Sequence, residues 1–173
     1  MPDSHRGGRR HEEREDLTGE HALADIGQLI LVVLFAGVWI ADSFFLEWTT
    51  FLNVHVPLVI RVPVGAVLLA LAALLGQTSH RVIFGETRSE PRVVRKGVFA
   101  AVRHPMYLGE ILLYLGLLSM SLSLAAGAVW LAAIGFLHYI SRAEEKLLLA
   151  RFGDEYAAYL RDVGMWIPRP RKQ

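Results

Sequence analysis

The sequence predicts an all-α integral membrane protein with four transmembrane helices, the last two of which form a short hairpin. Two observations support this prediction. Hydrophobic residues make up 53% of the 173 residues and are concentrated in blocks, while the charged residues fall into separate segments. The polar segments then alternate along the chain between basic ones and ones without Lys or Arg. The chain has no cysteine, which excludes disulfides, thiol nucleophiles and cysteine-ligated metal sites.

The first half of the chain predicts a tail and two spans. Residues 1–25 show no apolar periodicity and are predicted to be a disordered tail. The first predicted span covers residues 26–46, whose length at ~1.5 Å per residue matches the ~30 Å of the hydrocarbon core. The second covers residues 57–76 and begins at Pro57, a residue suited to the first turn of a helix. Residues 26–173 are predicted to form one membrane domain.

A long run without charge, residues 111–141, predicts the hairpin. As a single helix it would measure ~46 Å, which is too long for one crossing without extreme tilt. Serine residues near its middle allow the chain to reverse. We therefore predict two short spans, at residues 107–120 and 124–140, followed by a cytoplasmic helix and tail at residues 141–173.

The distribution of Lys and Arg supports this count of spans. Residues 77–106 carry a net charge of +4 and residues 141–173 a net charge of +2. The connections at residues 47–56 and 121–123 contain no Lys or Arg. Basic segments favour the cytoplasmic side, so four spans place both basic segments and both termini in the cytoplasm. Three spans would place the basic segments on opposite faces.

Two polar clusters flank the predicted hairpin, at residues 96–110 and 141–168. Because the hairpin returns the chain to its starting face, the two clusters can form one site. Glu110 lies about one turn inside the third span, where a carboxylate needs a partner. Arg103 or Arg142 is the expected partner.

Several other chemistries find no support in these segments. There is no phosphate-binding GxxxxGK[ST] loop and no GxSxG elbow, and the histidines lack metal-ligand spacing. The basic segments lack interleaved aromatic residues, so they predict membrane lipid headgroups as partners and no nucleic acid. A simpler interpretation of Arg103 and His104, as anchors of a helix in the headgroup layer, stays open on these grounds.

The two clusters carry a recognisable set of motifs. The matching pieces are Arg103-His104-Pro105-Met106-Tyr107-Leu108-Gly109, Glu144-Glu145, Phe152-Gly153, Tyr156, Tyr159 and Ile167-Pro168. In the order and spacing of these pieces, over nearly half of the chain, the sequence resembles the isoprenylcysteine carboxyl methyltransferase family and the related phospholipid methyltransferases. The resemblance implies a membrane methyltransferase that binds S-adenosylmethionine at the cytoplasmic face. The substrate it implies is lipid-like, such as the carboxylate of a prenylated cysteine on a small molecule or protein.

The resemblance also implies roles for individual residues. The implied cofactor contacts are Phe99, Ala100, Ala101, Val102, His104, Tyr107, Leu112, Leu115 and Glu144. Arg142 is the candidate for orienting the anionic group of the substrate. A carboxylate acceptor needs no general base, whereas an amine acceptor needs a proton acceptor, for which His104 or Glu110 are the candidates.

Two alternatives belong to other functional classes. Steroid-reductase-like membrane enzymes, which use NADPH, also carry a motif similar to RHPxYxGE, and Glu110 fits that version. A non-enzymatic membrane interaction protein would use the same basic faces without binding a cofactor. The Glu144-Glu145 pair and the short chain favour methyl transfer.

Overall fold

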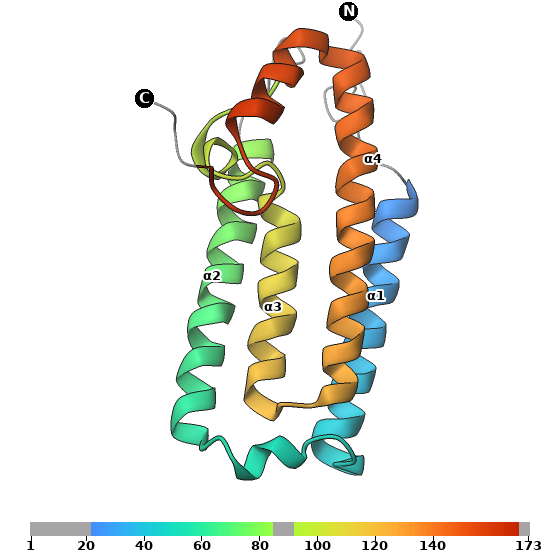
Figure 1. Cartoon of the computed structure of the whole chain (residues 1–173), viewed down its shortest axis with the longest axis vertical. Helices are drawn as coiled ribbons and strands as arrows, with labels where there is room; N and C mark the ends of the chain where they lie inside the picture. The colour runs from blue at the N-terminus through green and yellow to red at the C-terminus, as the bar shows by residue number, and fades with distance from the viewer. Residues whose placement is uncertain (1–21, 85–91, 170–173) are drawn as a thin grey trace, which may run out of the picture.

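The described part of the chain folds into an up-and-down bundle of four helices (Figure 1). The computed structural model describes residues 22–84 and 92–169, so the predicted disorder of the N-terminal tail falls almost entirely outside the described residues. The helices are α1 (Ala22–Ala41), α2 (Leu58–Phe84), α3 (Pro105–Ser121) and α4 (Leu124–Asp162). Short helical turns η2 (Asp42–Leu46), η3 (Phe51–Val54) and η4 (Gly97–Ala100) lie in the connections. Within the described ranges there is no β-strand, only an isolated bridge between Val102 and Gly164.

The composition of the helices identifies an integral membrane protein. Among the described residues, three helical stretches are long and apolar enough to cross a membrane: Asp25–Leu46, Leu58–Ile83 and Leu124–Asp162. The fourth helix, α3, is apolar but shorter. Many large hydrophobic side chains of α1 and α2 are exposed on the surface of the bundle. Such a surface requires an apolar solvent, which a bilayer supplies.

The predicted reversal between the third and fourth helices is present. Leu122 adopts a left-handed conformation (φ 51°) and its N–H donates to the carbonyl of Leu118 at 2.7 Å. Ser123 then caps α4, its hydroxyl accepting the N–H of Ala126 at 3.1 Å. A side-chain cap of this kind satisfies a backbone donor that the first helical turn leaves free. The helices themselves extend further than predicted, since α2 continues past residue 76 and α4 past residue 140.

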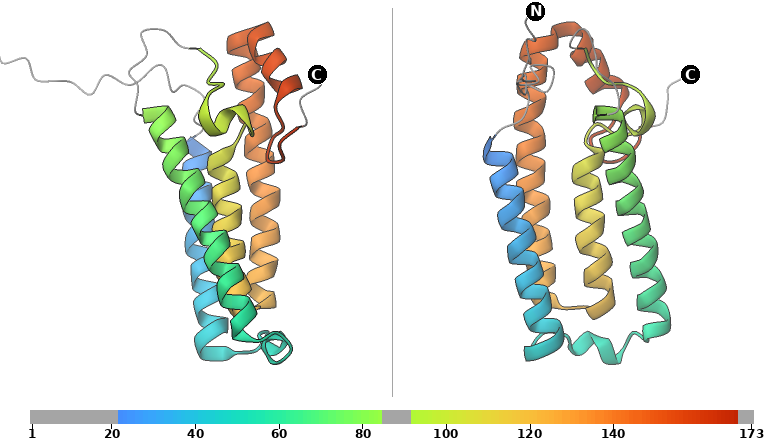
Figure 2. Two further views of the ribbon diagram at one scale, coloured as in Figure 1. Left: turned by 90° about the vertical axis from the view of Figure 1, so that its left-hand side faces the viewer. Right: turned by 180° about the vertical axis from the view of Figure 1, so that it is seen from behind.

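The long α4 bends back at Gly153, which has non-helical dihedral angles (φ 52°, ψ −127°). This region of backbone space favours glycine, which has no Cβ. Figures 1 and 2 show the chain rising along α4, turning over at the top of the bundle and descending beside the start of α3. The Phe152-Gly153 motif therefore marks the bend that returns the last helical turns to the bundle.

Close helix packing fixes the position of α3 against α2. A Cβ atom on Gly116 would lie 2.9 Å from the Cγ of Leu69, and one on Gly109 would lie 3.3 Å from the carbonyl oxygen of Ala72. Small residues at such positions let two helix backbones approach closely, as is common between helices in membranes. On another side of α3, the ring of Tyr114 stacks on Phe35 of α1 with ring centres 4.4 Å apart.

Buried polar groups tie the connections together at the end of the bundle that holds the hairpin turn. Asp42 is buried and accepts a hydrogen bond from the hydroxyl of Ser123 at 2.6 Å and from the N–H of Thr49 at 3.1 Å. Arg61 is also buried and donates to the carbonyl of Met120 at 2.6 Å. The contacts of Asp42 join the α1–α2 connection to the turn between α3 and α4, and the contact of Arg61 joins the start of α2 to the end of α3.

Candidate functional site

The motif residues gather at the opposite end of the bundle from the hairpin turn. The backbone N–H of Arg103 donates to the carbonyl of Gly164 at 2.9 Å, and that of His104 donates to Met165 at 3.2 Å. Pro105 follows as the first residue of α3, where its missing N–H costs no helical hydrogen bond. The corner before α3 is thus paired with the end of the chain, and we call this the motif end.

A buried ion pair forms the centre of the motif end. The guanidinium of Arg103 contacts Oε1 of Glu145 through Nε at 2.8 Å and through Nη2 at 2.7 Å. Both side chains are 5% exposed. Desolvated charges of this kind persist only when each has its partner, because an isolated buried charge is strongly unfavourable. The pair links the corner before α3 to the middle of α4.

His104 lies between the two glutamates. Its Nδ1 is 3.5 Å from Oε2 of Glu144, and its Nε2 is 3.3 Å from Oε1 of Glu145. The hydroxyl of Tyr107 donates to the other oxygen of Glu144, and the Tyr107 ring lies parallel to the imidazole with centres 5.6 Å apart. With a carboxylate facing each ring nitrogen, both nitrogens are suited to carry protons.

This environment shifts the pKa of His104. Burial alone would lower it, but the hydrogen bonds and negative charges of Glu144 and Glu145 outweigh burial and raise the pKa above its ordinary value. A histidine whose pKa is raised on folding stabilises the protein fully below its ordinary pKa of about 6.5. That stabilisation is lost as the pH rises through the raised value of the folded state.

We therefore expect the thermal midpoint of the wild type to fall, relative to that of a His104→Gln variant, as the pH rises from the ordinary histidine pKa through the raised one. Thermal unfolding in detergent at a series of pH values measures the difference. Parallel pH profiles for the two proteins would contradict the interaction of His104 with the two glutamates.

Two tyrosines of the folded-back part of α4 complete the motif end. Tyr156 and Tyr159 are both buried and pack with Val163. The hydroxyl of Tyr159 donates to the carbonyl of Phe99 at 2.7 Å. Arg95 lies over the ring of Tyr159 with its guanidinium carbon 5.3 Å from the ring centre. The tyrosines thus hold the strip before the Arg-His-Pro corner against the end of the chain.

The comparison with known families now decides the class of the protein. The sequence model of the phospholipid methyltransferase family matches residues 60–155, which is more than half of the chain. The chain belongs to the phospholipid methyltransferase family. It is therefore a membrane methyltransferase of the class that acts on lipid-like substrates, as the resemblance predicted. A comparison with curated proteins found no match.

The family match covers most of the site but leaves two parts outside. Most of α2, all of α3 and α4 as far as Glu155 lie within it, and so do both motif clusters up to that residue. Helix α1 lies outside, and so do residues 156–169. Those last residues nevertheless contribute Tyr156 and Tyr159 to the motif end of this methyltransferase.

The structure brings some of the predicted cofactor contacts together. His104, Tyr107 and Glu144 contact one another. In the strip before them, Phe99 is half-buried, Ala100 and Ala101 are exposed, and Val102 is buried beside Gly164. Leu112 and Leu115 are half-buried on α3, roughly 8 and 12 Å further along the helix axis than Tyr107 at ~1.5 Å per residue. These two leucines are thus one layer deeper than the polar cluster.

The prediction that Arg103 or Arg142 pairs with Glu110 is wrong. Neither Arg103 nor Arg142 contacts this carboxylate: it accepts hydrogen bonds from the amide of Gln28 at 3.1 Å and from the hydroxyl of Tyr114 at 2.5 Å. The reason is rotational, because the face of α3 that carries Glu110 is turned toward α1. Both donors are uncharged, so these two contacts supply hydrogen bonds to Glu110 but no positive charge.

Arg142 lies at the edge of the cluster. Its side chain is 62% exposed, and Nη1 is 3.6 Å from Oε2 of Glu145. Oε1 of the same carboxylate is held by Arg103, so Glu145 links a buried arginine with an exposed one. An exposed arginine keeps donors available for an anion.

Two residues at the centre of the site were not among the predicted site residues: Arg103 and Glu145. The sequence allowed each a local role, Arg103 as a headgroup anchor and Glu145 as part of a solvated helix face. The available signal was the pair of motifs itself, because a chain that reverses between Arg-His-Pro and Glu-Glu brings an arginine and a glutamate to the same end of the bundle. The buried position of the contact depends on the fold-back at Gly153.

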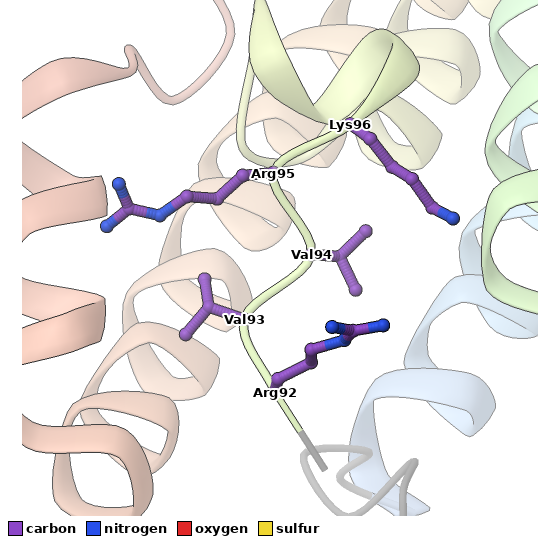
Figure 3. A pocket seen from close by; sticks show the side chains of 5 residues that line it. All are labelled: Arg92, Val93, Val94, Arg95 and Lys96. Carbon is purple, nitrogen blue, oxygen red and sulfur yellow. The ribbon is translucent and has the colours of Figure 1, made fainter. Parts of the chain in front are cut away.

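A cavity of about 350 Å³ lies beside the motif end. It is lined by the extended residues 92–96 (Figure 3). In Figure 3 Arg95 points away from Lys96, toward the folded-back part of α4, where its Nη2 donates to the carbonyl of Glu155 at 2.5 Å. Three of the five lining residues are basic, and one of them, Arg95, also pairs with Asp162, with its Nη1 3.6 Å from Oδ2.

Proposed function

We propose that the chain is an S-adenosylmethionine-dependent methyltransferase that acts at the cytoplasmic face of a membrane on a lipid-borne carboxylate, such as that of a prenylated cysteine. One observation carries the proposal: His104 stands between Glu144 and Glu145, so two motifs from opposite ends of a hairpin share one cluster. Family membership supplies the reaction class, and the charges of the cluster suggest what it binds.

The residues of the cluster fit the cofactor. Glu145 is paired with Arg103, whereas the Glu144 side chain is 17% exposed and, among the residues that the structure describes, forms no ion pair with an arginine. A carboxylate held by Tyr107 and His104 suits the ammonium group of the cofactor's amino-acid end. When bound, S-adenosylmethionine supplies an electrophilic methyl group on a positively charged sulfonium. In the proposal Glu144, His104 and Tyr107 hold its polar end, and residues 99–102, Leu112 and Leu115 line the remainder.

The remaining residues act on the substrate. A carboxylate acceptor is ionised at neutral pH, so the protein needs to orient it and exclude water rather than remove a proton. Arg142, which is exposed beside the cluster, is proposed to hold the anionic group. Glu110, whose two partners are neutral donors, is proposed to lie on the membrane side of the acceptor. It is the group that would accept a proton from an amine in place of a carboxylate.

Calorimetric titration of the purified protein with S-adenosylmethionine, S-adenosylhomocysteine and NADPH tests the proposed cofactor. Binding of both S-adenosyl compounds without binding of NADPH is expected. Tight binding of NADPH with no S-adenosyl binding would overturn the proposal in favour of a reductase.

We further propose that all four helices cross the membrane and that both termini are cytoplasmic. The antiparallel bundle alternates direction at each connection, and the 17 residues of α3 span ~26 Å at ~1.5 Å per residue. That length approaches the hydrocarbon thickness, and its polar neighbours at the motif end can occupy the headgroup layer.

Single cysteines test this topology, because the natural chain has none. A His55→Cys variant, in the connection between α1 and α2, is expected to react with a membrane-impermeant maleimide on intact cells. An Arg161→Cys variant is expected to react only after the cells are permeabilised. Labelling of both variants on intact cells would contradict the four-span arrangement.

A further inference from the structure

Backbone carbonyl groups near the end of the described chain bind the Arg-His-Pro corner. We call residues 160–166 the C-terminal segment. The carbonyls of Leu160 and Val163 both accept hydrogen bonds from Nη1 of Arg103, the former at 3.2 Å. The carbonyl of Gly164 accepts the backbone N–H of the same arginine at 2.9 Å. Side chain and backbone of one residue therefore hold the segment in place.

This binding uses the particular shape of arginine. Nε and Nη2 of Arg103 both reach Oε1 of Glu145, while Nη1 reaches the two carbonyls. A guanidinium presents five N–H donors in a rigid plane, so one side chain can contact a carboxylate and a backbone turn together. A lysine carries the same charge but has three donors at a single point, and it cannot span these acceptors.

The residues that Arg103 contacts also contact His104, at its ring and at its backbone. Oε1 of Glu145, which Arg103 holds, is also 3.3 Å from Nε2 of His104. The backbone N–H of His104 donates to Met165, which belongs to the C-terminal segment. Both the ring and the backbone of His104 are therefore positioned by groups that Arg103 fixes.

The path of the segment depends on Gly164 and ends on an aromatic contact. A Cβ atom on Gly164 would lie 1.8 Å from the carbonyl oxygen of Ile167, so a larger residue cannot keep this turn. Two residues further on, the Trp166 ring meets the ring of His138 on α4 edge-on, with centres 5.7 Å apart. The segment thus has further contacts, at the turn of Gly164 and at α4, that do not involve the side chain of Arg103.

We propose that Arg103 is a positioning residue, which clamps the C-terminal segment against the motif end and so fixes the imidazole of His104 between its two glutamates. The C-terminal segment then forms part of the site by positioning His104, although it lies outside the family match. The link from this clamp to cofactor binding rests on the proposed function, whereas the clamp itself does not.

Three variants of the full chain, reconstituted in lipid nanodiscs, test the clamp. Arg103→Lys keeps the positive charge and removes the planar guanidinium with its five N–H donors. Gly164→Ala disturbs the same segment without touching the ion pair, and it keeps the test open if Arg103→Lys fails to fold. Arg161→Lys is the matched control, because Arg161 is exposed in the last turn of α4.

Two measurements without cofactor decide the proposal. Amide hydrogen exchange across residues 160–169 is expected to rise about tenfold in Arg103→Lys and Gly164→Ala, because clamping hydrogen bonds are lost, and to stay unchanged in the control. The ¹⁵N imidazole signals of His104, assigned with a His104→Gln sample, are expected to move in the same two variants. Unchanged exchange, or raised exchange with an unmoved His104 signal, would overturn the proposal.

A third measurement joins the clamp to the proposed function. The KM for S-adenosylmethionine is expected to rise about tenfold in Arg103→Lys with a smaller change in kcat, since the clamp fixes a binding wall. A fall in kcat with unchanged KM would overturn this assignment. If the wild type bound no S-adenosylmethionine, the proposed function would fail alone, because the exchange and NMR measurements need no cofactor.

Discussion

Replacing Glu145 by Gln is expected to lower the free energy of unfolding by roughly 3–5 kcal/mol, the usual cost of removing one partner from a buried ion pair. The variant keeps the shape of the side chain but leaves the guanidinium of Arg103, which is 5% exposed, without its counter-charge. It also removes the charge that faces Nε2 of His104. Unfolding of the purified protein by titration with a denaturing detergent measures the loss.

Glu155→Gln is the control for this substitution, because Glu155 is an exposed acid on the same helix. We expect its effect to stay within about 0.5 kcal/mol, as for most surface substitutions. Equal stability of the two variants would show that the pair between Arg103 and Glu145 does not hold the motif end together.

Replacing Glu144 by Ala is expected to weaken the binding of S-adenosylmethionine roughly 10- to 100-fold, the loss of one charge-assisted hydrogen bond. The bundle should persist, because the ion pair between Arg103 and Glu145 does not involve Glu144. His104→Ala is expected to weaken binding in the same direction, since the imidazole contacts the Glu144 carboxylate. Calorimetric titration of both variants measures the change.

An exposed acid on the same helix, Asp154, provides the matched control. Asp154→Ala is expected to bind the cofactor as the wild type does. Unchanged affinity in both Glu144→Ala and His104→Ala would refute the assignment of the cluster to the cofactor, whatever the activity of the protein.

The meeting of the two motif clusters could be predicted from sequence because it depends on one coarse feature. A charge-free run too long for one crossing, flanked by two basic segments, has to reverse if both segments lie on one face. The structure places the turn at residues 122–123, within the predicted connection at residues 121–123. Once the chain reverses, His104 and Glu144 return to the same end, and their order along α3 and α4 brings them together.

The details of the site depend on rotations and bends that the sequence does not display. Glu110 contacts Gln28 and Tyr114 because its face of α3 is turned toward α1, and no periodicity distinguishes that rotation from one toward Arg142. The buried state of Arg103 depends on the bend at Gly153, which in the sequence is a single glycine in a helical pattern. Polar residues after position 140 predicted a new segment, whereas α4 continues because no residue before Gly153 stops it.

Mass spectrometry of lipid extracts provides the decisive measurement of the reaction. Extracts would be incubated with S-adenosylmethionine that carries an isotopically labelled methyl group, and with the wild type or Glu144→Ala. We predict that the wild type transfers the label to a lipid-like molecule as a methyl ester, and that Glu144→Ala transfers much less at the same cofactor concentration. Absence of labelled lipid with the wild type, or equal labelling by the two proteins, would contradict a methyl-transfer site built on the paired glutamates.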